Sequence, residues 1–214
     1  MAIIALTVII KLLLSPLYQL QLSMSRKSML EQRKLAPEIA KLKKKFKGDA
    51  AKLNQATMEL YKEHGVNPLG GLAGCLPAVA QFPILTALYW AFLKFRVSDA
   101  HFLFIPSLID APNKHPLIPG LPFIPTVVFA VIPLLAALST YVQAKMMQQP
   151  PNPLASEQEL QAQQMTKSMS MMMPLMIAFF AITTPAGLGL YWFVSNCVAI
   201  IQQYFVTGWG QLGK

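Results

Sequence analysis

Five long apolar segments constrain the fold of this 214-residue sequence more than any other feature. A transmembrane helix needs about 20 mostly apolar residues, and hydrocarbon offers no hydrogen-bond partner to backbone outside a helix or a closed barrel. Charged residues make up 13% of the chain, against about 25% in soluble domains. A soluble core would not hide this much apolar surface. We therefore predict an all-α integral membrane protein with five transmembrane helices.

The alternation of apolar and polar segments predicts the organisation of the chain. Only the four residues TPAG, at 184–187, separate the fourth span from the fifth, which predicts an antiparallel hairpin. In chain order we expect a first transmembrane helix (1–22), a basic helical hairpin (23–74), a second transmembrane helix (75–97), a proline-rich outer loop (98–124), a third transmembrane helix (125–147), a cytoplasmic loop (148–168), a fourth and fifth transmembrane helix (169–206) and a short cytoplasmic tail (207–214).

The distribution of charge predicts the orientation. Residues 23–74 hold 11 of the 18 Lys and Arg residues but five of the nine Asp and Glu residues. Segments rich in Lys and Arg stay on the cytoplasmic side of a membrane. With five spans, the N-terminus then lies outside and the C-terminus inside.

The same basic segment has the pattern of two helices. Asp49 is a predicted N-cap and Gly65 a predicted residue just past a helix end. Before Asp49, apolar residues recur on one helical face at Leu35, Ile39, Leu42 and Phe46. We expect a cytoplasmic two-helix hairpin between spans one and two.

Lys11 is the least expected residue in the apolar segments. A charged side chain at the centre of a bilayer costs about 2.5–3.5 kcal/mol on insertion scales, and no Asp or Glu lies within the five spans. Lys11 is therefore either deprotonated in a dry site or in contact with water inside the membrane.

Polar residues at helical spacing favour water. Hydroxyl groups alone are weak evidence for a hydrated cavity, because Ser and Thr commonly join transmembrane helices. Around the lysine, however, they predict a hydrated cavity that opens to the cytoplasm. Its expected lining comes from spans one, three and five and consists of Thr7, Lys11, Ser15, Gln19, Ser139, Gln143, Tyr191, Ser195 and Asn196.

Six of the 12 methionines lie between residues 165 and 176. Unbranched thioethers suit a surface that accepts many apolar helices, although ordinary packing would use them as well. The methionines expected to contact an apolar substrate are Met169, Met172, Met173 and Met176.

A copper(I) transporter is the alternative function, because MxxxM pairs supply soft ligands. The basic hairpin and Lys11 argue against it, since they would repel a cation. We expect no enzyme activity, cofactor or metal site. Cys75 and Cys197 have no metal-ligand spacing, and the chain has no nucleotide-binding Walker pattern.

Three long runs resemble the YidC/Oxa/Alb family of membrane-protein insertases. They are KLLLSPLYQLQLSMSRKSMLEQRKLAPEIAKLKKKFKGD (11–49), MELYKEHGVNPLGGLAGCLPAVAQFPILTALYWAF (58–92) and TPAGLGLYWFVSNCVAIIQQYF (184–205). The resemblance implies a five-span core, a cytoplasmic hairpin and a hydrophilic groove that is open to the cytoplasm and to lipid but closed on the outer side. It places Lys11 at the basic centre of the groove, where the family most often has arginine. It also matches Gln143 to a glutamine of the third span, and Tyr191 and Trp192 to an aromatic pair of the fifth.

The resemblance also implies a function and partners. A YidC-like insertase receives nascent membrane proteins in the bilayer, beside the ribosome, the signal recognition particle system and the Sec translocon. We expect this chain to work as a monomer in the bacterial plasma (inner) membrane rather than in a thylakoid.

Overall fold

The computed structural model describes residues 2–46, 49–66, 76–94, 101–148 and 157–213. Apart from two isolated bridges in the 101–126 region, the regular structure of these residues is helical, which confirms the all-α prediction. The elements are α1 (Ala2–Leu13), α2 (Ser15–Lys45), α3 (Ala50–Glu63), α4 (Leu76–Lys94), the 3-10 helix η2 (Pro112–Lys114), α5 (Val127–Met147), α6 (Glu157–Thr183), α7 (Ala186–Thr207) and the 3-10 helix η3 (Gly210–Gly213).

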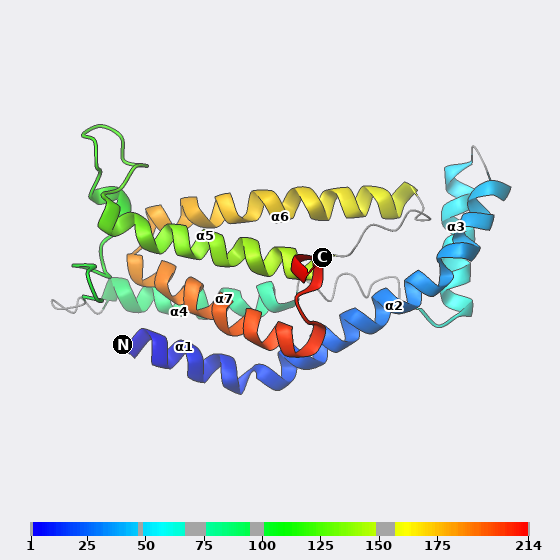
Figure 1. The fold of residues 1–214 in the computed structure, drawn as a ribbon, viewed down its shortest axis with the longest axis horizontal. Helices are drawn as coiled ribbons and strands as arrows, with labels where there is room; N and C mark the ends of the chain where they lie inside the picture. Colours follow the sequence, from blue (N-terminus) through cyan, green and yellow to red (C-terminus); the bar gives the residue numbers. More distant parts are fainter. Residues whose placement is uncertain (1, 47–48, 67–75, 95–100, 149–156, 214) are drawn as a thin grey trace.

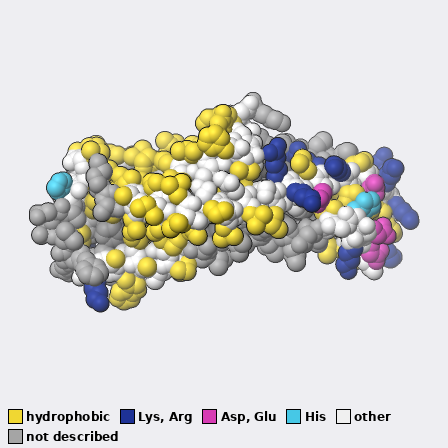
Figure 2. Space-filling view, turned by 90° about the horizontal axis from the view of Figure 1, so that it is seen from below, with side chains coloured by type: hydrophobic (Ala, Val, Ile, Leu, Met, Phe, Trp, Pro, Cys, Tyr) yellow, Lys and Arg dark blue, Asp and Glu magenta, His cyan; other side chains and the backbone are white. Residues whose placement is uncertain are grey.

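The helices form an elongated bundle with a separate hairpin at one end. In Figure 1, α1, α4, α5, α6 and α7 run along the long axis, whereas α3 and the end of α2 stand beyond the bundle. α5 packs along both α6 and α7, and α7 also contacts α1, α2 and α4. Figure 2 shows hydrophobic side chains over the bundle and Lys and Arg gathered toward the hairpin. This separation agrees with a membrane-embedded bundle and a hairpin in water.

Two helices are long and apolar enough to cross a membrane, α5 over Val127–Met147 and the Gln163–Thr183 part of α6. The bent pair Ile3–Leu13 and Ser15–Lys45 adds a third if it counts as one span. These are the candidate spans among the described residues. α7 is 22 residues long but includes Asn196, Gln202 and Gln203, and it is not one of these two helices. Five spans and their orientation therefore stay a prediction.

The first predicted span is not one straight helix. α1 ends at Leu13, α2 begins at Ser15, and the two meet at 56°. Pro16 lies in the first turn of α2, where it has no N–H for the carbonyl of Leu12 and its ring crowds that carbonyl. The helix does not end at residue 22, because α2 continues through Lys45 into the hairpin, and the end of the first span at that residue stays a prediction.

Two other boundaries differ from the prediction. α6 begins at Glu157, so residues 157–168 of the predicted 148–168 loop are helical. Residues 149–156 of that loop lie outside the described residues, as do 47–48 and 67–74 of the basic segment and the ends of the second span at 75 and 95–97. α5 and α7 begin and end within two residues of the third and fifth predicted spans.

The hairpin has the predicted ends and a small core of its own. The Asp49 carboxylate accepts a hydrogen bond from the N–H of Lys52 at 3.1 Å and caps α3. At the other end, Gly65 has φ +64°, and the N–H of Val66 reaches the carbonyl of Tyr61 at 2.8 Å, which forms a Schellman motif. The buried core of the hairpin consists of Leu35, Ile39, Tyr61 and Val66.

The loop between α4 and α5 closes one end of the bundle. The carbonyls of Leu108 and Asp110 accept the N–H groups of Gly187 and Ala186 at 2.8 and 3.0 Å. They satisfy donors at the start of α7 that have no partner within the helix. A buried apolar cluster lies beside them and comprises Ile105, Leu108, Phe129, Ile132, Ala186 and Leu190.

Gly189 lets α5 and α7 approach closely, and we predict that Gly189→Ala destabilises the bundle. An added Cβ would lie 2.6 Å from Cγ2 of Ile132. Overpacking costs about 1–3 kcal/mol, which outweighs the helix preference for Ala of up to about 1 kcal/mol. Thermal unfolding in detergent measures the effect. Adding Ile132→Ala removes the clashing methyl, so the double variant should be less destabilised than the two single changes combined. Simple additivity would contradict the close contact.

We also predict that Asp49 makes the start of α3 sensitive to pH. The backbone N–H and side chain of Lys52 hold the pKa of the Asp49 carboxyl below its ordinary value. Its stabilising effect is therefore complete above the unfolded pKa of about 3.9 and is lost as the pH falls through the lower folded value. Hydrogen exchange in the first turn of α3, corrected for intrinsic rates, should show this loss. Asp49→Ala should lose the protection already at pH 6, whereas Asp49→Asn, which keeps the acceptor, should retain most of it.

Candidate functional site

Lys11 lies in the last turn of α1, just before the Pro16 kink, and is half-buried. Its ammonium group donates to Oε1 of Gln81 on α4 at 3.3 Å. Nε2 of Gln81 donates in turn to the hydroxyl of Tyr191 on α7 at 2.6 Å. We call these three residues the Lys11 chain. It joins α1, α4 and α7 through side chains that lie far apart in the sequence.

The Lys11 chain contains one charge and no counter-charge. The ion pairs of the described residues join other side chains, so Lys11 has a neutral amide as its partner. An amide offsets only part of what an ammonium group loses when it leaves water. The site is therefore suited to a water molecule or to an acidic group that approaches Lys11.

Ser139 and Asn196 lie in the buried interface between α5 and α7. Nδ2 of Asn196 donates to the hydroxyls of Ser139 at 3.0 Å and Thr140 at 2.8 Å. Both hydroxyls donate to the carbonyl of Ala136 on their own helix. All three polar side chains are buried, so in this structure they join two helices and are satisfied by each other.

The polar residues predicted to line the cavity from the first span are Thr7, Lys11, Ser15 and Gln19, four residues apart. The kink divides them between α1 and α2. Thr7 is buried, and its hydroxyl donates to the carbonyl of Ile3 at 2.6 Å. Beyond the kink, Gln19 is exposed and donates to the hydroxyl of half-buried Ser15 at 3.2 Å. The spacing of four residues does not keep these side chains together, because the 56° bend separates the two halves.

The remaining predicted residues lie on α5 and α7. Gln143 is half-buried and faces the Tyr18 hydroxyl, which has no hydrogen bond of normal geometry. Ser195 is buried one turn after Tyr191 and interacts with its hydroxyl. Trp192 points elsewhere, since its ring lies 6.3 Å from the ring of Phe180 on α6. The Lys11 chain thus brings together Lys11 and Tyr191 of the predicted set, with Ser195 beside them.

Methionines cover the outward face of α6. Ser170, Pro174, Ile177 and Ala181 form its buried face, at the spacing of one helical side. The exposed methionines of α6 are Met165, Met169, Met171, Met172, Met173 and Met176, and Leu160, Leu175, Phe179 and Phe180 are exposed beside them. The described residues contain no group of three or more His, Cys, Asp or Glu side chains able to hold a metal ion.

Comparison with known proteins identifies the family. The family model described as "60Kd inner membrane protein" matches residues 1–211. The chain belongs to this family. It is the YidC/Oxa/Alb family that the sequence motifs resemble.

Curated relatives carry the name "Membrane protein insertase YidC". Those of Pseudomonas fluorescens and Pseudomonas putida are each 37% identical over 206 residues, and that of Pseudomonas entomophila is 36% identical. The match covers 96% of this chain but 31% of each relative. The chain thus spans about a third of the length of these relatives. None of these relatives is described as a copper transporter.

Gln81 is the site residue that the predicted lining omitted. It is the central member of the Lys11 chain, and a glutamine within an apolar span was the signal that could have found it. Gln202 was omitted as well, although it is buried and its amide lies 3.5 Å from the carbonyl of Lys11. Both are amides on helices that meet α1, which spacing within one helix does not reveal.

We predict that Gln81→Leu destabilises the bundle by about 1–3 kcal/mol, because it leaves Lys11 and the Tyr191 hydroxyl without their partner. Thermal unfolding in detergent measures the loss. Thr86→Val on the same helix is the matched control, since the exposed Thr86 hydroxyl bonds only the carbonyl of Phe82 on its own helix. Equal effects of the two substitutions would argue against a chain that joins three helices.

Proposed function

We propose that this chain is a membrane-protein insertase of the bacterial inner membrane. It receives a hydrophobic segment from the cytoplasm and moves the short polar tail of that segment across, while the apolar helix enters lipid. The observation that carries the proposal is the Lys11 chain, in which a basic side chain lies between membrane helices and, among the described residues, has a neutral amide as its partner. A charge without a counter-ion is available to an acidic tail. Family membership and the name of the relatives support the same activity.

The proposed groove centres on Lys11 and opens toward the basic hairpin. The polar side chains assigned to its centre are Gln81, Tyr191 and Ser195, with Ser15, Gln19 and Gln143 on α2 and α5. The other predicted residues, Thr7, Ser139, Asn196 and Trp192, lie in contacts within or between helices and support the groove from there. The outer end is closed by the loop that caps α7 and by its apolar cluster. In this arrangement the chain has five spans, an outer N-terminus and an inner C-terminus.

Electrostatics and burial provide the driving force. Two unit charges about 4 Å apart attract by about 1 kcal/mol in water and by about 4 kcal/mol at an effective dielectric constant of 20. Burial of the apolar helix of the substrate contributes about 25 cal/mol per Å². The membrane potential adds about 2.3 kcal/mol per 100 mV for each negative charge that moves outward. No nucleotide and no covalent step is needed.

The methionine face of α6 is the proposed contact for the apolar helix of the substrate, through Met169, Met172, Met173 and Met176. These side chains are exposed and unbranched, so they adapt to helices of different shape. The partners of such an insertase are nascent membrane proteins and the bilayer, with the ribosome, the signal recognition particle system and the Sec translocon upstream. One chain holds the whole proposed site, which favours a monomer.

Replacing Lys11 tests the proposal. The chain is reconstituted in liposomes and offered two single-span substrates, one with an acidic N-terminal tail and one with a neutral tail. Lys11→Gln should lower insertion of the acidic-tail substrate about tenfold, a loss of about 1.4 kcal/mol. The neutral-tail substrate should change little, and Lys11→Arg should keep the acidic-tail activity.

Two controls show which results would contradict the proposal. Lys41→Gln removes the same charge from the exposed surface of α2 and should leave insertion unchanged. If the liposomes with the chain insert no more of either substrate than empty liposomes do, the insertase proposal is wrong for this chain. If Lys11→Gln lowers the insertion of both substrates equally, Lys11 has a structural role and does not attract the acidic tail.

A further inference from the structure

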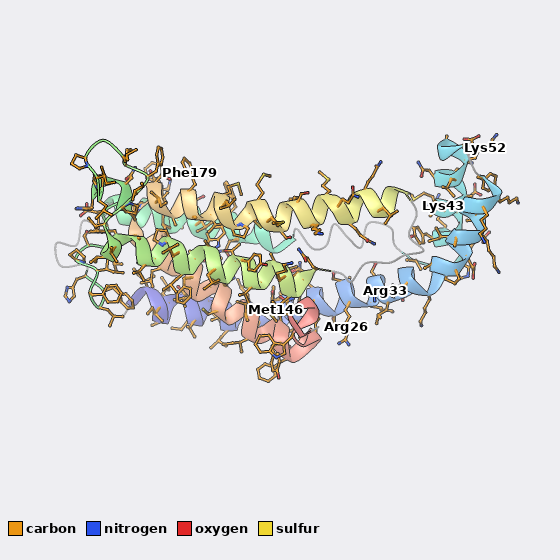
Figure 3. The ribbon with its side chains drawn as sticks, turned by 45° about the horizontal axis from the view of Figure 1, so that its top comes forward. Arg26, Arg33, Lys43, Lys52, Met146 and Phe179 are labelled. Carbon is orange, nitrogen blue, oxygen red and sulfur yellow. The ribbon has the colours of Figure 1, made fainter. Side chains whose placement is uncertain are left out.

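An open cavity of about 520 Å³ lies between α2 and the C-terminal end of α7, away from the Lys11 chain. Its basic residues are Arg26, Lys27 and Lys34, and its acid is Glu31. Leu30 and Val206 give it an apolar side. Figure 3 shows Arg26 on α2 beside the end of α7, far from Lys43 and Lys52 on the hairpin. The volume falls in the range of about 300–1,000 Å³ that is usual for small-ligand sites.

Arg26 is held in place by the backbone of α7. One of its terminal N–H groups donates to the carbonyl of Val206 at 2.7 Å. That carbonyl belongs to the last turn of α7, where it has no partner within the helix and carries part of the negative end of the helix dipole. The bond uses one of the five N–H donors of the guanidinium group. The group is thus held at the cavity and keeps further N–H donors for an anion.

Lys27 and Lys34 add positive charge at the same site. They lie seven residues apart on α2 and therefore on one side of the helix. Lys27 pairs with Glu31 at 3.9 Å, but its side chain is 79% exposed, and such surface pairs contribute little. An incoming phosphate group therefore loses little by displacing Glu31 from Lys27.

Exposed aromatic residues indicate that the cavity lies at the depth of the boundary between the hydrocarbon core of a bilayer and water. Tyr204, Phe205 and Trp209 flank Val206 and are exposed, with the rings of Tyr204 and Trp209 4.9 Å apart. Tyr and Trp gather at the boundary between hydrocarbon and water. Beside them, exposed Ile201 and Phe205 offer an apolar surface on α7 along which acyl chains pack.

We propose that this cavity binds the phosphate headgroup of an anionic phospholipid, with its acyl chains against the end of α7. A headgroup phosphate at this level meets Arg26, Lys27 and Lys34 together, and a zwitterionic headgroup lacks the net charge that they favour. The bound lipid covers the place where α7 ends against α2. The proposal goes beyond insertion and does not depend on it, because its test measures lipid binding alone.

The test uses tryptophan fluorescence in vesicles. The chain has three Trp residues, so Trp90→Phe and Trp192→Phe leave Trp209 beside the cavity as the reporter. This variant is reconstituted in phosphatidylcholine vesicles that contain brominated phosphatidylglycerol or, in parallel, brominated phosphatidylcholine. Bromine quenches the fluorescence of nearby tryptophan, and the dependence on lipid fraction gives the relative association constant. We expect phosphatidylglycerol to quench Trp209 at lower fractions.

Two charge variants decide whether the cavity causes this preference. Lys27→Gln with Lys34→Gln keeps Arg26 and its bond to Val206, so α7 stays anchored. It should lower the relative affinity for phosphatidylglycerol roughly 30-fold, because each cation near an anionic surface is worth about a factor of five. Lys41→Gln with Lys44→Gln removes the same charge from exposed positions of α2 outside the cavity and should change little.

Three outcomes would overturn the proposal. Equal quenching by the two lipids would show that the cavity has no preference for an anionic headgroup. An equal loss in the two charge variants would assign the preference to overall charge. Displacement of the lipid by inorganic phosphate, with Trp209 returning to full fluorescence, would make free phosphate the ligand.

Discussion

The contact between α5 and α7 is the interaction on which the rest of the structure depends. In hydrocarbon, helices gain little from apolar contact alone, so they associate through close packing and through polar groups that satisfy each other. Gly189 provides the close packing against Ile132, and Asn196 provides the polar bond to Ser139 and Thr140. With α7 held against α5, its other sides receive α1, α2 and α4.

The two ends of α7 are satisfied by different parts of the chain. The loop between α4 and α5 supplies carbonyls to its first N–H groups, and Arg26 of α2 donates to a carbonyl of its last turn. The first N–H groups and the last carbonyls of a helix need partners from outside the helix. The same device that stabilises α7 therefore closes one end of the bundle and, at the other, orients the arginine of the proposed lipid site.

Sequence reasoning was most successful where the signal is local. The caps of α3, at Asp49 and Gly65, follow from residue types that favour those backbone positions. It failed at the first span, where Pro16 bends the helix and separates Ser15 and Gln19 from Lys11. The proline was visible, but the direction of the bend depends on which helices pack on either side.

The sequence by itself determined that the chain is helical and rich in apolar spans, that its charge gathers in one hairpin, and that Lys11 has no acidic partner within a span. These properties follow from composition and from periods of a few residues. Only the tertiary structure decided that Lys11 meets Gln81 and Tyr191, and that Ser139 and Asn196 meet each other in a buried interface. Residues 57 or more positions apart come together through helix packing, and the periodicity of a single helix does not report which face its neighbour covers.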